Sequence, residues 1–320
     1  TQTVTVVDNI DPTLTVPANI TVNVDAGACS VDAANVTLGN PTAADNCSVT
    51  TSNDAPSSYP VGTTTVTWTA VDPSGNDVTA TQTVTVVDNI DPTITAPAAV
   101  TVNCDAGVCS AAAANVTLGS ATTADNCSVA STTNDAPNSF PVGTTTVTWT
   151  VTDASGRTAT ATQDVTVVDN IDPTITAPAN VTVNVDAGQC DADAANVTLG
   201  NATTADNCGV QSTTNDAPNT YPVGTTTVTW TVTDVNGRTA TATQDVTVED
   251  NIDPTLTAPA DVTVNVDAGA CSAAAANVTL GNPTAADNCS VTTSNVAPNS
   301  YPVGTTTVMW PAVNPTGNDI

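Results

Sequence analysis

The chain contains no His and no Lys, and only two basic residues, Arg157 and Arg238, stand against 31 acidic ones. A net charge of -29 repels anionic phosphate, and the basic residues that release counterions from nucleic acid are missing. Nucleic acid and anionic membrane surfaces are therefore excluded as partners. General acid-base catalysis also lacks its usual side chains, and no acidic pair stands apart from the rest. We expect a protein that is not an enzyme and that attracts cations.

Aromatic residues are scarce, at 2% of the chain, and no apolar run approaches the roughly 20 residues of a membrane span. No signal peptide is visible, so we expect a mature segment or a window of a longer chain. The aromatic residues recur at regular positions, which marks them as core anchors and not as a carbohydrate-stacking platform. They are Trp68, Trp149, Trp230 and Trp310, with Tyr59, Phe140, Tyr221 and Tyr301.

The main feature of the sequence is a unit that recurs four times. The phrase Asp-Asn-Ile-Asp-Pro-Thr begins at Asp8, Asp88, Asp169 and Asp250, at a nearly constant spacing. Near-identity at a fixed period is typical of tandem arrays and is a poor way to build one active site. The predicted organisation is a final strand of a preceding or neighbouring repeat, followed by four repeats, the last without its final strand: 1–7, 8–87, 88–168, 169–249 and 250–320.

Within a repeat, short segments alternate apolar and polar residues, as in 20–24, 66–70 and 84–86. This period of two predicts strands with one face on a core, and Thr is the usual outward residue. Clusters of Gly, Pro, Asn and Asp separate the segments at short, regular intervals. About seven short strands per repeat predict an all-β fold of tandem immunoglobulin-like β-sandwiches that form an extended rod.

Eight of the nine Cys form four pairs, one in each repeat and all at the same separation in the sequence. One pair per repeat in a chain without His indicates a structural disulfide, which would stabilise each repeat by about 3 kcal/mol in an oxidising, extracellular or cell-surface location. The expected bonds are Cys29 with Cys47, Cys109 with Cys127, Cys190 with Cys208, and Cys271 with Cys289.

Cys104 is the ninth Cys and is not expected to bond to Cys109. It stands where the other repeats have Val24, Val185 and Val266. It is either a small buried apolar residue or an intermolecular cross-link.

The segment 140–167, the Asp-Pro-Thr-Ile opening at Asp172 and the Ala-Asp-Asn-Cys step at 205–208 closely resemble the hyalin repeat (HYR) family. The resemblance covers all four repeats. It implies extracellular immunoglobulin-like modules that occur in tandem, with a non-enzymatic role in adhesion or matrix structure. Family members often carry a further Cys where this chain has Trp68, Trp149, Trp230 and Trp310, so a second disulfide per domain is not implied.

An immunoglobulin-like topology brings the linker, the loop between the second and third strands and the last hairpin to one pole. Carboxylates that converge there, with no basic partner, would repel one another and would suit a Ca²⁺ ion, although the same motifs are ordinary turn formers. The fourth repeat departs, with Val296 and Asn314 in place of Asp. The candidate ligands are Asp8, Asn9, Asp11, Asp45, Asp72, Asp88, Asn89, Asp91, Asp125, Asp153, Asp169, Asn170, Asp172, Asp206, Asp234, Asp250, Asn251, Asp253 and Asp287.

Ten Asn-x-Ser/Thr sequons make the chain a candidate glycoprotein. Four of them recur in every repeat, although strand formation around the Val that follows explains the recurrence equally well. These glycosylation candidates are Asn35, Asn115, Asn196 and Asn277.

We interpret the chain as a structural subunit or segment of an extracellular filament, stalk or matrix fibre. The alternatives are an adhesin or a carbohydrate- or protein-binding surface protein whose repeats act as a spacer, and a lectin-like module with exposed aromatics. Residues 1–7 match residues 81–87, the final strand that the fourth repeat lacks. Either the chain is a window of a longer one, or residues 1–7 complete the fourth repeat of a neighbouring copy in a head-to-tail filament.

Overall fold

The computed structural model describes residues 1–319. The chain divides into two compact units, Thr1–Val168 and Asp169–Ile320. Each unit holds two sequence repeats. The described residues form strands and four single 3₁₀ turns, so the predicted all-β class is confirmed. No helix among them is long and apolar enough to cross a membrane.

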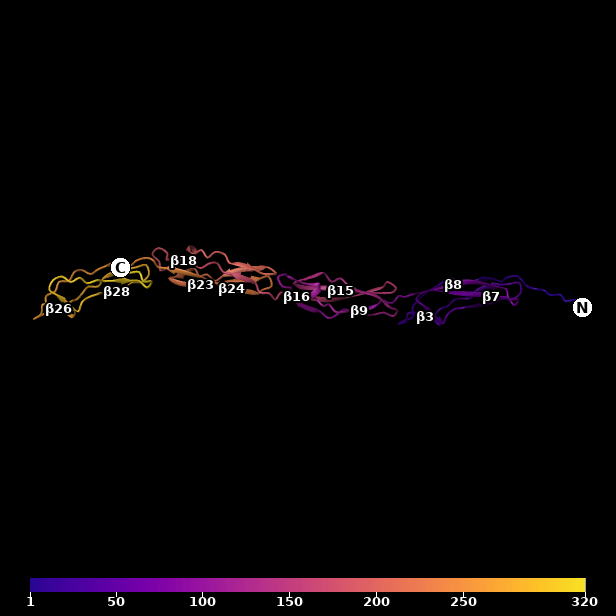
Figure 1. The fold of residues 1–320 in the computed structure, drawn as a ribbon. Helices are drawn as coiled ribbons and strands as arrows, with labels where there is room; N and C mark the ends of the chain where they lie inside the picture. Colours follow the sequence, from indigo (N-terminus) through magenta and orange to yellow (C-terminus); the bar gives the residue numbers. More distant parts are fainter. Residues whose placement is uncertain (320) are drawn as a thin grey trace. The chain divides into compact units, whose positions relative to one another are not determined.

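The first repeat has eight strands. They are β1 (Thr13–Thr15), β2 (Ile20–Asn23), β3 (Ser30–Asp32), β4 (Thr42–Ala44), β5 (Thr50–Asn53), β6 (Ser58–Pro60), β7 (Gly62–Val71) and β8 (Asp77–Val87), with a 3₁₀ turn at Ala33–Asn35. One sheet has the order β2-β8-β7-β5, in which β2 runs parallel to β8 and the other pairs are antiparallel. The pairs β1-β4 and β3-β6 pack on it through a shared core, which gives the sandwich (Figure 1).

The second and third repeats reproduce this topology, with four-stranded sheets of order β10-β16-β15-β13 and β18-β24-β23-β21. The second repeat contains β9 (Thr93–Thr95), β10 (Val100–Asn103), β11 (Ser110–Ala112), β12 (Thr122–Ala124), β13 (Val129–Asn134), β14 (Ser139–Pro141), β15 (Gly143–Asp153) and β16 (Thr158–Val168). The third contains β17 (Thr174–Thr176), β18 (Val181–Asn184), β19 (Asp191–Asp193), β20 (Thr203–Ala205), β21 (Val210–Asn215), β22 (Thr220–Pro222), β23 (Gly224–Asp234) and β24 (Thr239–Glu249).

The alternating sequence pattern places its apolar residues in the core. Along β7, Val66, Trp68 and Ala70 point inward and are buried, while the Thr residues between them are more exposed. Tyr59 is buried in the same core as Trp68. The aromatic residues of the first three repeats are therefore core anchors, because burial of a large ring contributes most in a core with few other large side chains.

A buried Gln on the last strand joins the two layers of each complete repeat. Gln82 on β8 is fully buried; its Oε1 accepts from Trp68 Nε1 at 3.1 Å, and its Nε2 donates to the Ala18 and Leu38 carbonyls at 2.7 and 3.0 Å. Gln163 and Gln244 make the same three hydrogen bonds. Sequence analysis missed this residue because it reads as an ordinary polar position in a strand.

The described residues of the fourth repeat lack the strand that carries this Gln. This repeat contains β25 (Thr255–Thr257), β26 (Ser272–Ala274), β27 (Thr284–Ala286), β28 (Thr292–Thr293), β29 (Ser300–Pro302) and β30 (Ala312–Val313), and no strand among its described residues corresponds to β8. Val264 is 42% exposed, whereas its counterpart Val22 packs against the core of the first repeat. A groove of about 680 Å³ runs between residues 262–266 and 303–310.

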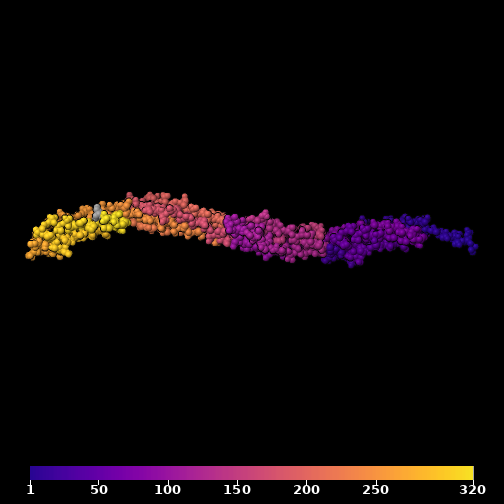
Figure 2. All heavy atoms as spheres, in the orientation of Figure 1, coloured from indigo at the N-terminus to yellow at the C-terminus, as the bar shows by residue number. Residues whose placement is uncertain are grey.

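Residues 1–7 have no strand partner in the described structure. All seven are exposed, and Val4 and Val6 are among the most exposed apolar side chains. They project from the body of the first repeat at its indigo end (Figure 2).

We expect Gln163→Leu to destabilise the second repeat by about 3 kcal/mol, because the lost hydrogen bonds outweigh the gain from the apolar replacement. The change leaves the buried Trp149 Nε1 without a partner, at about 1–3 kcal/mol, and removes the hydrogen bonds to two partly buried carbonyls. Hydrogen exchange of peptides from β15 and β16 in the whole chain measures this. Thr162→Ala, an exposed change on the same strand, is the matched control and should stay within about 0.5 kcal/mol of wild type. Equal protection in Gln163→Leu and wild type would contradict the prediction.

Candidate functional site

The acidic residues concentrate at the beginning of each repeat, where the linker meets the loop before its second Cys. In the second repeat, a carboxylate oxygen of Asp88, one of Asp125 and the Sγ of Cys127 lie within 4.8 Å of one another. The first repeat brings together Asp8, Asp45 and Cys47 in the same way, and the corresponding groups in the other two are Asp169, Asp206 and Cys208, and Asp250, Asp287 and Cys289. Convergence of the linker with this loop agrees with the topology expected from the sequence.

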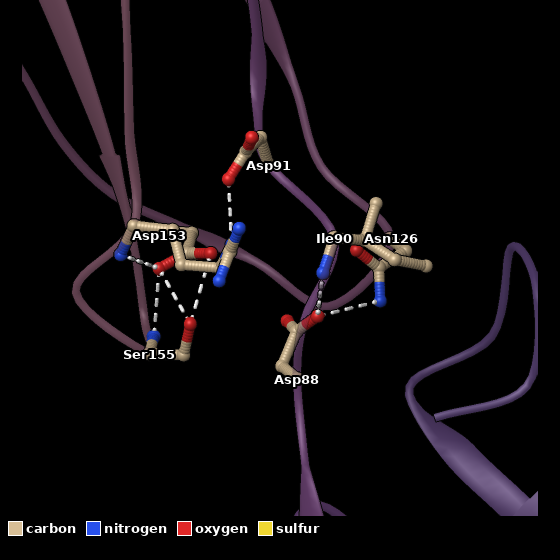
Figure 3. A network of polar contacts seen from close by, with 7 residues as sticks. Asp88, Ile90, Asp91, Asn126, Asp153 and Ser155 are labelled. Atoms are coloured by element: carbon tan, nitrogen blue, oxygen red, sulfur yellow. Dashed lines mark hydrogen bonds and ion pairs between the residues drawn. The ribbon is translucent and has the colours of Figure 1, made fainter. Parts of the chain in front are cut away.

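Backbone N–H groups hold these carboxylates in place. Asp88 Oδ1 accepts from Ile90 N at 3.1 Å and from Asn126 Nδ2 at 3.4 Å (Figure 3). Asp125 Oδ2 accepts from Cys127 N at 2.9 Å. The second oxygen of each, Asp88 Oδ2 and Asp125 Oδ1, is buried and has no hydrogen-bond partner. Since Asp88 is only 4% exposed, this cluster holds negative charge that water reaches poorly.

The other repeats satisfy the oxygen that corresponds to Asp88 Oδ2. Asp169 Oδ2 accepts from Asn236 Nδ2 at 2.7 Å, and Asp250 Oδ2 accepts from Asn314 Nδ2 at 3.0 Å. Asn314 stands where the second repeat has Asp153, so an amide replaces a carboxylate beside the linker. The four clusters are therefore chemically different despite their shared sequence motif.

Asp153 serves the hairpin between β15 and β16. Its Oδ1 accepts from the N–H groups of Arg157 and Ser155 at 2.7 and 2.9 Å, and the Ser155 hydroxyl lies 3.0 Å from both of its oxygens (Figure 3). Burial by itself raises the pKa of Asp153, but the hydrogen bonds from Arg157, Ser155 and Gly156 outweigh it and hold the pKa below its usual range. The carboxylate is thus ionised at neutral pH.

Two acidic candidates have a basic partner that sequence analysis missed. Asp91 Oδ1 accepts from Arg157 Nε at 2.6 Å, and Asp172 Oδ1 lies 2.6 Å from Arg238 Nη2. The expectation that junction carboxylates have no basic partner was wrong at these positions. Both pairs are largely exposed, and such pairs contribute about 0–1 kcal/mol. The linker Asn residues are exposed and lie outside the described clusters: Asn9, Asn89, Asn170 and Asn251.

In the first repeat the cluster includes an exposed thiol. Cys47 Sγ donates to Asp8 Oδ2 at 3.1 Å. This hydrogen bond is the main reason that the pKa of Asp8 is lowered and that of Cys47 is raised; the N–H of Ile10 lowers the pKa of Asp8 further.

The disulfides do not form within repeats as the sequence predicted. Cys29 bonds to Cys127 of the next repeat, and Cys190 bonds to Cys289, with Cα–Cα distances of 4.6 and 4.7 Å. Each bond contradicts two of the four expected pairs. Cys47 and Cys271 are exposed thiols, while Cys109 and Cys208 are also disulfide-bonded. The expected bonds were therefore wrong, although each observed bond still joins a Cys in a turn to a Cys in a loop.

The reason is the position of the two Cys in the sandwich. The loop Cys47 lies beside Asp8 at the beginning of its repeat, whereas the turn with Cys29 follows Val24, whose N–H donates to Val87 O at the end of the same repeat. The two Cys of one repeat thus lie near opposite poles. Consecutive repeats instead bring the turn of one to the loop of the next, where Asn126 Nδ2 also donates to Ala28 O at 2.9 Å.

The remaining sequence candidates have local roles. Cys104 is buried in the core at the position of Val24, as expected of a small apolar residue. The Nδ2 atoms of the recurrent sequon Asn residues donate to the Asp of the preceding turn, at 3.1, 2.8, 2.8 and 3.0 Å for Asn35, Asn115, Asn196 and Asn277. This hydrogen bond gives a structural reason for their recurrence, and glycosylation stays a prediction.

Comparison with known proteins matches the HYR domain family to residues 7–86, 87–167 and 168–248. The chain belongs to this family. It is 36% identical over 335 residues to Hyalin of Lytechinus variegatus, with 99% of this chain covered, and 34% identical over 329 residues to Hyalin of Strongylocentrotus purpuratus, with 98% covered. The chain spans 62% and 27% of the length of these two relatives.

Among solved structures, the HYR chain is similar to protocadherin gammaB7 domains EC3-6, at 12% identity and a TM-score of 0.33, over 79% of this chain and 77% of that one. A similarity at that TM-score does not indicate a function for this chain. Family membership and disulfides, which need an oxidising compartment, place the HYR chain outside the cell or at its surface.

We expect the double variant Cys29→Ser/Cys127→Ser to loosen the junction between the first two repeats without unfolding either core. The bond joins residues at a sequence separation of 98, and chain entropy gives an upper value of about 4.7 kcal/mol for a loop of that size. Hydrogen exchange should rise in residues 87–92 and stay unchanged in β7 and β8. The control Cys104→Val, a change within the core, should leave the junction protected. Peptide mapping of wild type that links Cys29 to Cys47 would contradict the observed pairing.

Proposed function

We propose that this HYR chain is a structural segment of an extracellular filament, stalk or matrix fibre that joins head-to-tail to copies of itself. The observation that carries the proposal is the open groove of the fourth repeat. In the first repeat the corresponding space is filled by β8, and residues 1–7 have the same sequence as residues 81–87 of that strand. We propose that residues 1–7 of a second copy fill the groove.

The match extends to individual side chains. Gln2 corresponds to the buried Gln82, and Val4 and Val6 correspond to Val84 and Val86, which are buried. In the fourth repeat Trp310 lines the groove, so a Gln at the position of Gln2 would supply the acceptor that Trp68 finds in Gln82. An added strand would also provide ladder hydrogen bonds to both edges of the groove.

We expect Val4→Asp to weaken self-association by a factor of 100 or more. Its counterpart Val84 is fully buried, and an unpaired carboxylate there loses its hydration. Thr1→Asp adds the same charge at a position whose counterpart Thr81 is exposed, so this control should associate like wild type. Light scattering and electron microscopy of the whole chain at several concentrations measure association. Equal assembly of both variants, or assembly after deletion of residues 1–7, would contradict this contact and favour a strand supplied by residues that follow in a longer chain.

We further propose that Ca²⁺ binds at the beginning of the repeats, and most tightly in the second. Asp88 Oδ2 and Asp125 Oδ1 are buried carboxylate oxygens without partners, which fits a hard cation that takes oxygen ligands. Cys127 is committed to its disulfide and would not bind the ion. A bound cation would supply the charge compensation that Asn314 Nδ2 supplies to Asp250 in the fourth repeat.

We expect Asp88→Asn and Asp125→Asn each to weaken Ca²⁺ binding at one site by about tenfold or more, since each removes a carboxylate ligand. Asn314→Asp should create a stronger site in the fourth repeat, because it removes the amide donor that satisfies Asp250 Oδ2. Calorimetric titration of the whole chain with Ca²⁺ after chelation measures affinity and stoichiometry. Asp77→Asn, an exposed acidic residue outside the clusters, is the control. Indistinguishable titrations for Asp88→Asn and Asp77→Asn would overturn the site.

The second candidate function is a spacer in an adhesin that presents a binding region elsewhere. The near-identity of the four repeats favours it as much as it favours a fibre, because neither role needs a unique repeat. Both roles are non-catalytic. Self-association through residues 1–7 separates them, since a spacer does not need to polymerise.

A further inference from the structure

We propose that Asn236 is a site of spontaneous deamidation, and that the product carboxylate converts the acidic cluster of the third repeat from an amide-bonded to a cation-dependent one. Asn236 is followed by Gly237, and this Asn-Gly pair is the only one in the sequence. Both residues are exposed, in the hairpin between β23 and β24. The consequence for cation binding rests on the Ca²⁺ sites proposed above, whereas the deamidation itself does not.

The hairpin leaves the reacting backbone accessible. Deamidation begins when the backbone N of Gly237 attacks the Cγ of Asn236, so it is fastest where no side chain crowds that N. A Cβ at Gly237 would meet no heavy atom within 4 Å, which shows open space around it. The Gly237 N–H donates to Asp234 O at 3.3 Å, beyond the usual range of such hydrogen bonds. Exposed side chains also change rotamer rapidly, so the hydrogen bond of the Asn236 amide does not prevent the attack.

The third repeat differs from the others at this position. Asn236 Nδ2 donates to the linker residue Asp169 through its Oδ2, at 2.7 Å. In the second repeat the side chain at this position is a hydroxyl, which bonds to both oxygens of Asp153 (Figure 3). Each of the three other repeats has a hydroxyl residue before the hairpin Gly: Ser74, Ser155 and Thr316.

The surroundings of Asn236 are acidic and poorly compensated. Asp234 is fully buried; its Oδ1 accepts from Asn236 N at 2.8 Å, and its Oδ2 has no hydrogen-bond partner. Asp206 Oδ1, from the same cluster as Asp169, is also buried without a partner. The Asn236 amide is therefore a neutral donor among carboxylates, and its conversion removes a hydrogen bond and adds a negative charge.

The reaction needs only water. The Gly237 N loses its proton and bonds to Asn236 Cγ, the bond from Cγ to the side-chain nitrogen breaks, and that nitrogen takes up a proton and leaves as ammonia. The product is a cyclic succinimide. A water molecule then opens the ring at either carbonyl, which gives aspartate or isoaspartate at this position. The sum consumes a water and releases an ammonia, with no oxidation or reduction.

Either product places a carboxylate where the amide donor was. Two ionised carboxylates at such a distance repel each other, so the contact between the hairpin and Asp169 weakens unless a cation joins them. The added oxygens are also ligands that Ca²⁺ prefers. We therefore expect the third repeat to bind Ca²⁺ more tightly after deamidation, because the amide no longer occupies Asp169 Oδ2.

The first test incubates the whole chain in mildly alkaline buffer and follows its Asn residues by peptide mapping, mass spectrometry and enzymatic methylation of isoaspartate. We expect Asn236 to convert at least tenfold faster than Asn138, which is also exposed but is followed by Ser. Asn236→Ser copies the second repeat and should remove the fast-converting site. Conversion of Asn236 at the rate of Asn138 or more slowly would overturn the inference.

The second test uses Asn236→Asp, which has the added carboxylate from the start. Asn236→Ser is the matched control, since it loses the same hydrogen bond without gaining charge. Without cations, hydrogen exchange of residues 169–172 should be severalfold faster in Asn236→Asp than in the control, and added Ca²⁺ should reverse this difference. Equal exchange in the two variants without cations would overturn the proposed effect of deamidation.

Calorimetric titration separates this inference from the proposed Ca²⁺ sites. Fast conversion of Asn236 in a chain that binds no Ca²⁺ would contradict those sites and leave the deamidation standing. Ca²⁺ binding that depends on Asp88 and Asp125, in a chain whose Asn236 stays intact, would support those sites and overturn the deamidation.

Discussion

Each repeat depends on the strand that comes last in it. β8 lies at the centre of the four-stranded sheet, between β2 and β7, and contributes Gln82, Val84 and Val86 to the core. The fourth repeat shows what remains without such a strand. The segment that corresponds to β2 is no longer a strand, and its Val residues are exposed. Removal of a central strand deprives both neighbours of their ladder, so the loss spreads beyond the missing residues.

The second constraint is charge. A chain with 31 acidic and two basic residues can neutralise only a few carboxylates with ion pairs, here Arg157–Asp91 and Arg238–Asp172. Other carboxylates accept hydrogen bonds from backbone N–H groups and side-chain amides. These interactions leave Asp88 Oδ2 and Asp125 Oδ1, beside the linker, buried without a hydrogen-bond partner. A cation is the simplest compensation for buried negative charge in such a chain.

The junctions within each unit combine this acidic cluster with a covalent bond. Cys29–Cys127 and Cys190–Cys289 fasten the turn of one repeat to the loop of the next. A disulfide placed there contributes to the junction and less to the core of a single repeat.

The sequence by itself determined the strands, the period of the repeats, the core aromatics and the approach of the linker to the loop, because alternation and turn residues act locally or within one topology. It did not determine the disulfide partners. In a periodic chain, the short sequence separation between the two Cys of one repeat recurs, and so does the long separation between Cys of consecutive repeats. The spacing therefore fits either pairing. Only the tertiary structure decided between them, by placing the two Cys of a repeat near opposite poles. The same holds for Gln82 and Arg157, whose roles depend on residues far away in the sequence that only folding brings within hydrogen-bond distance.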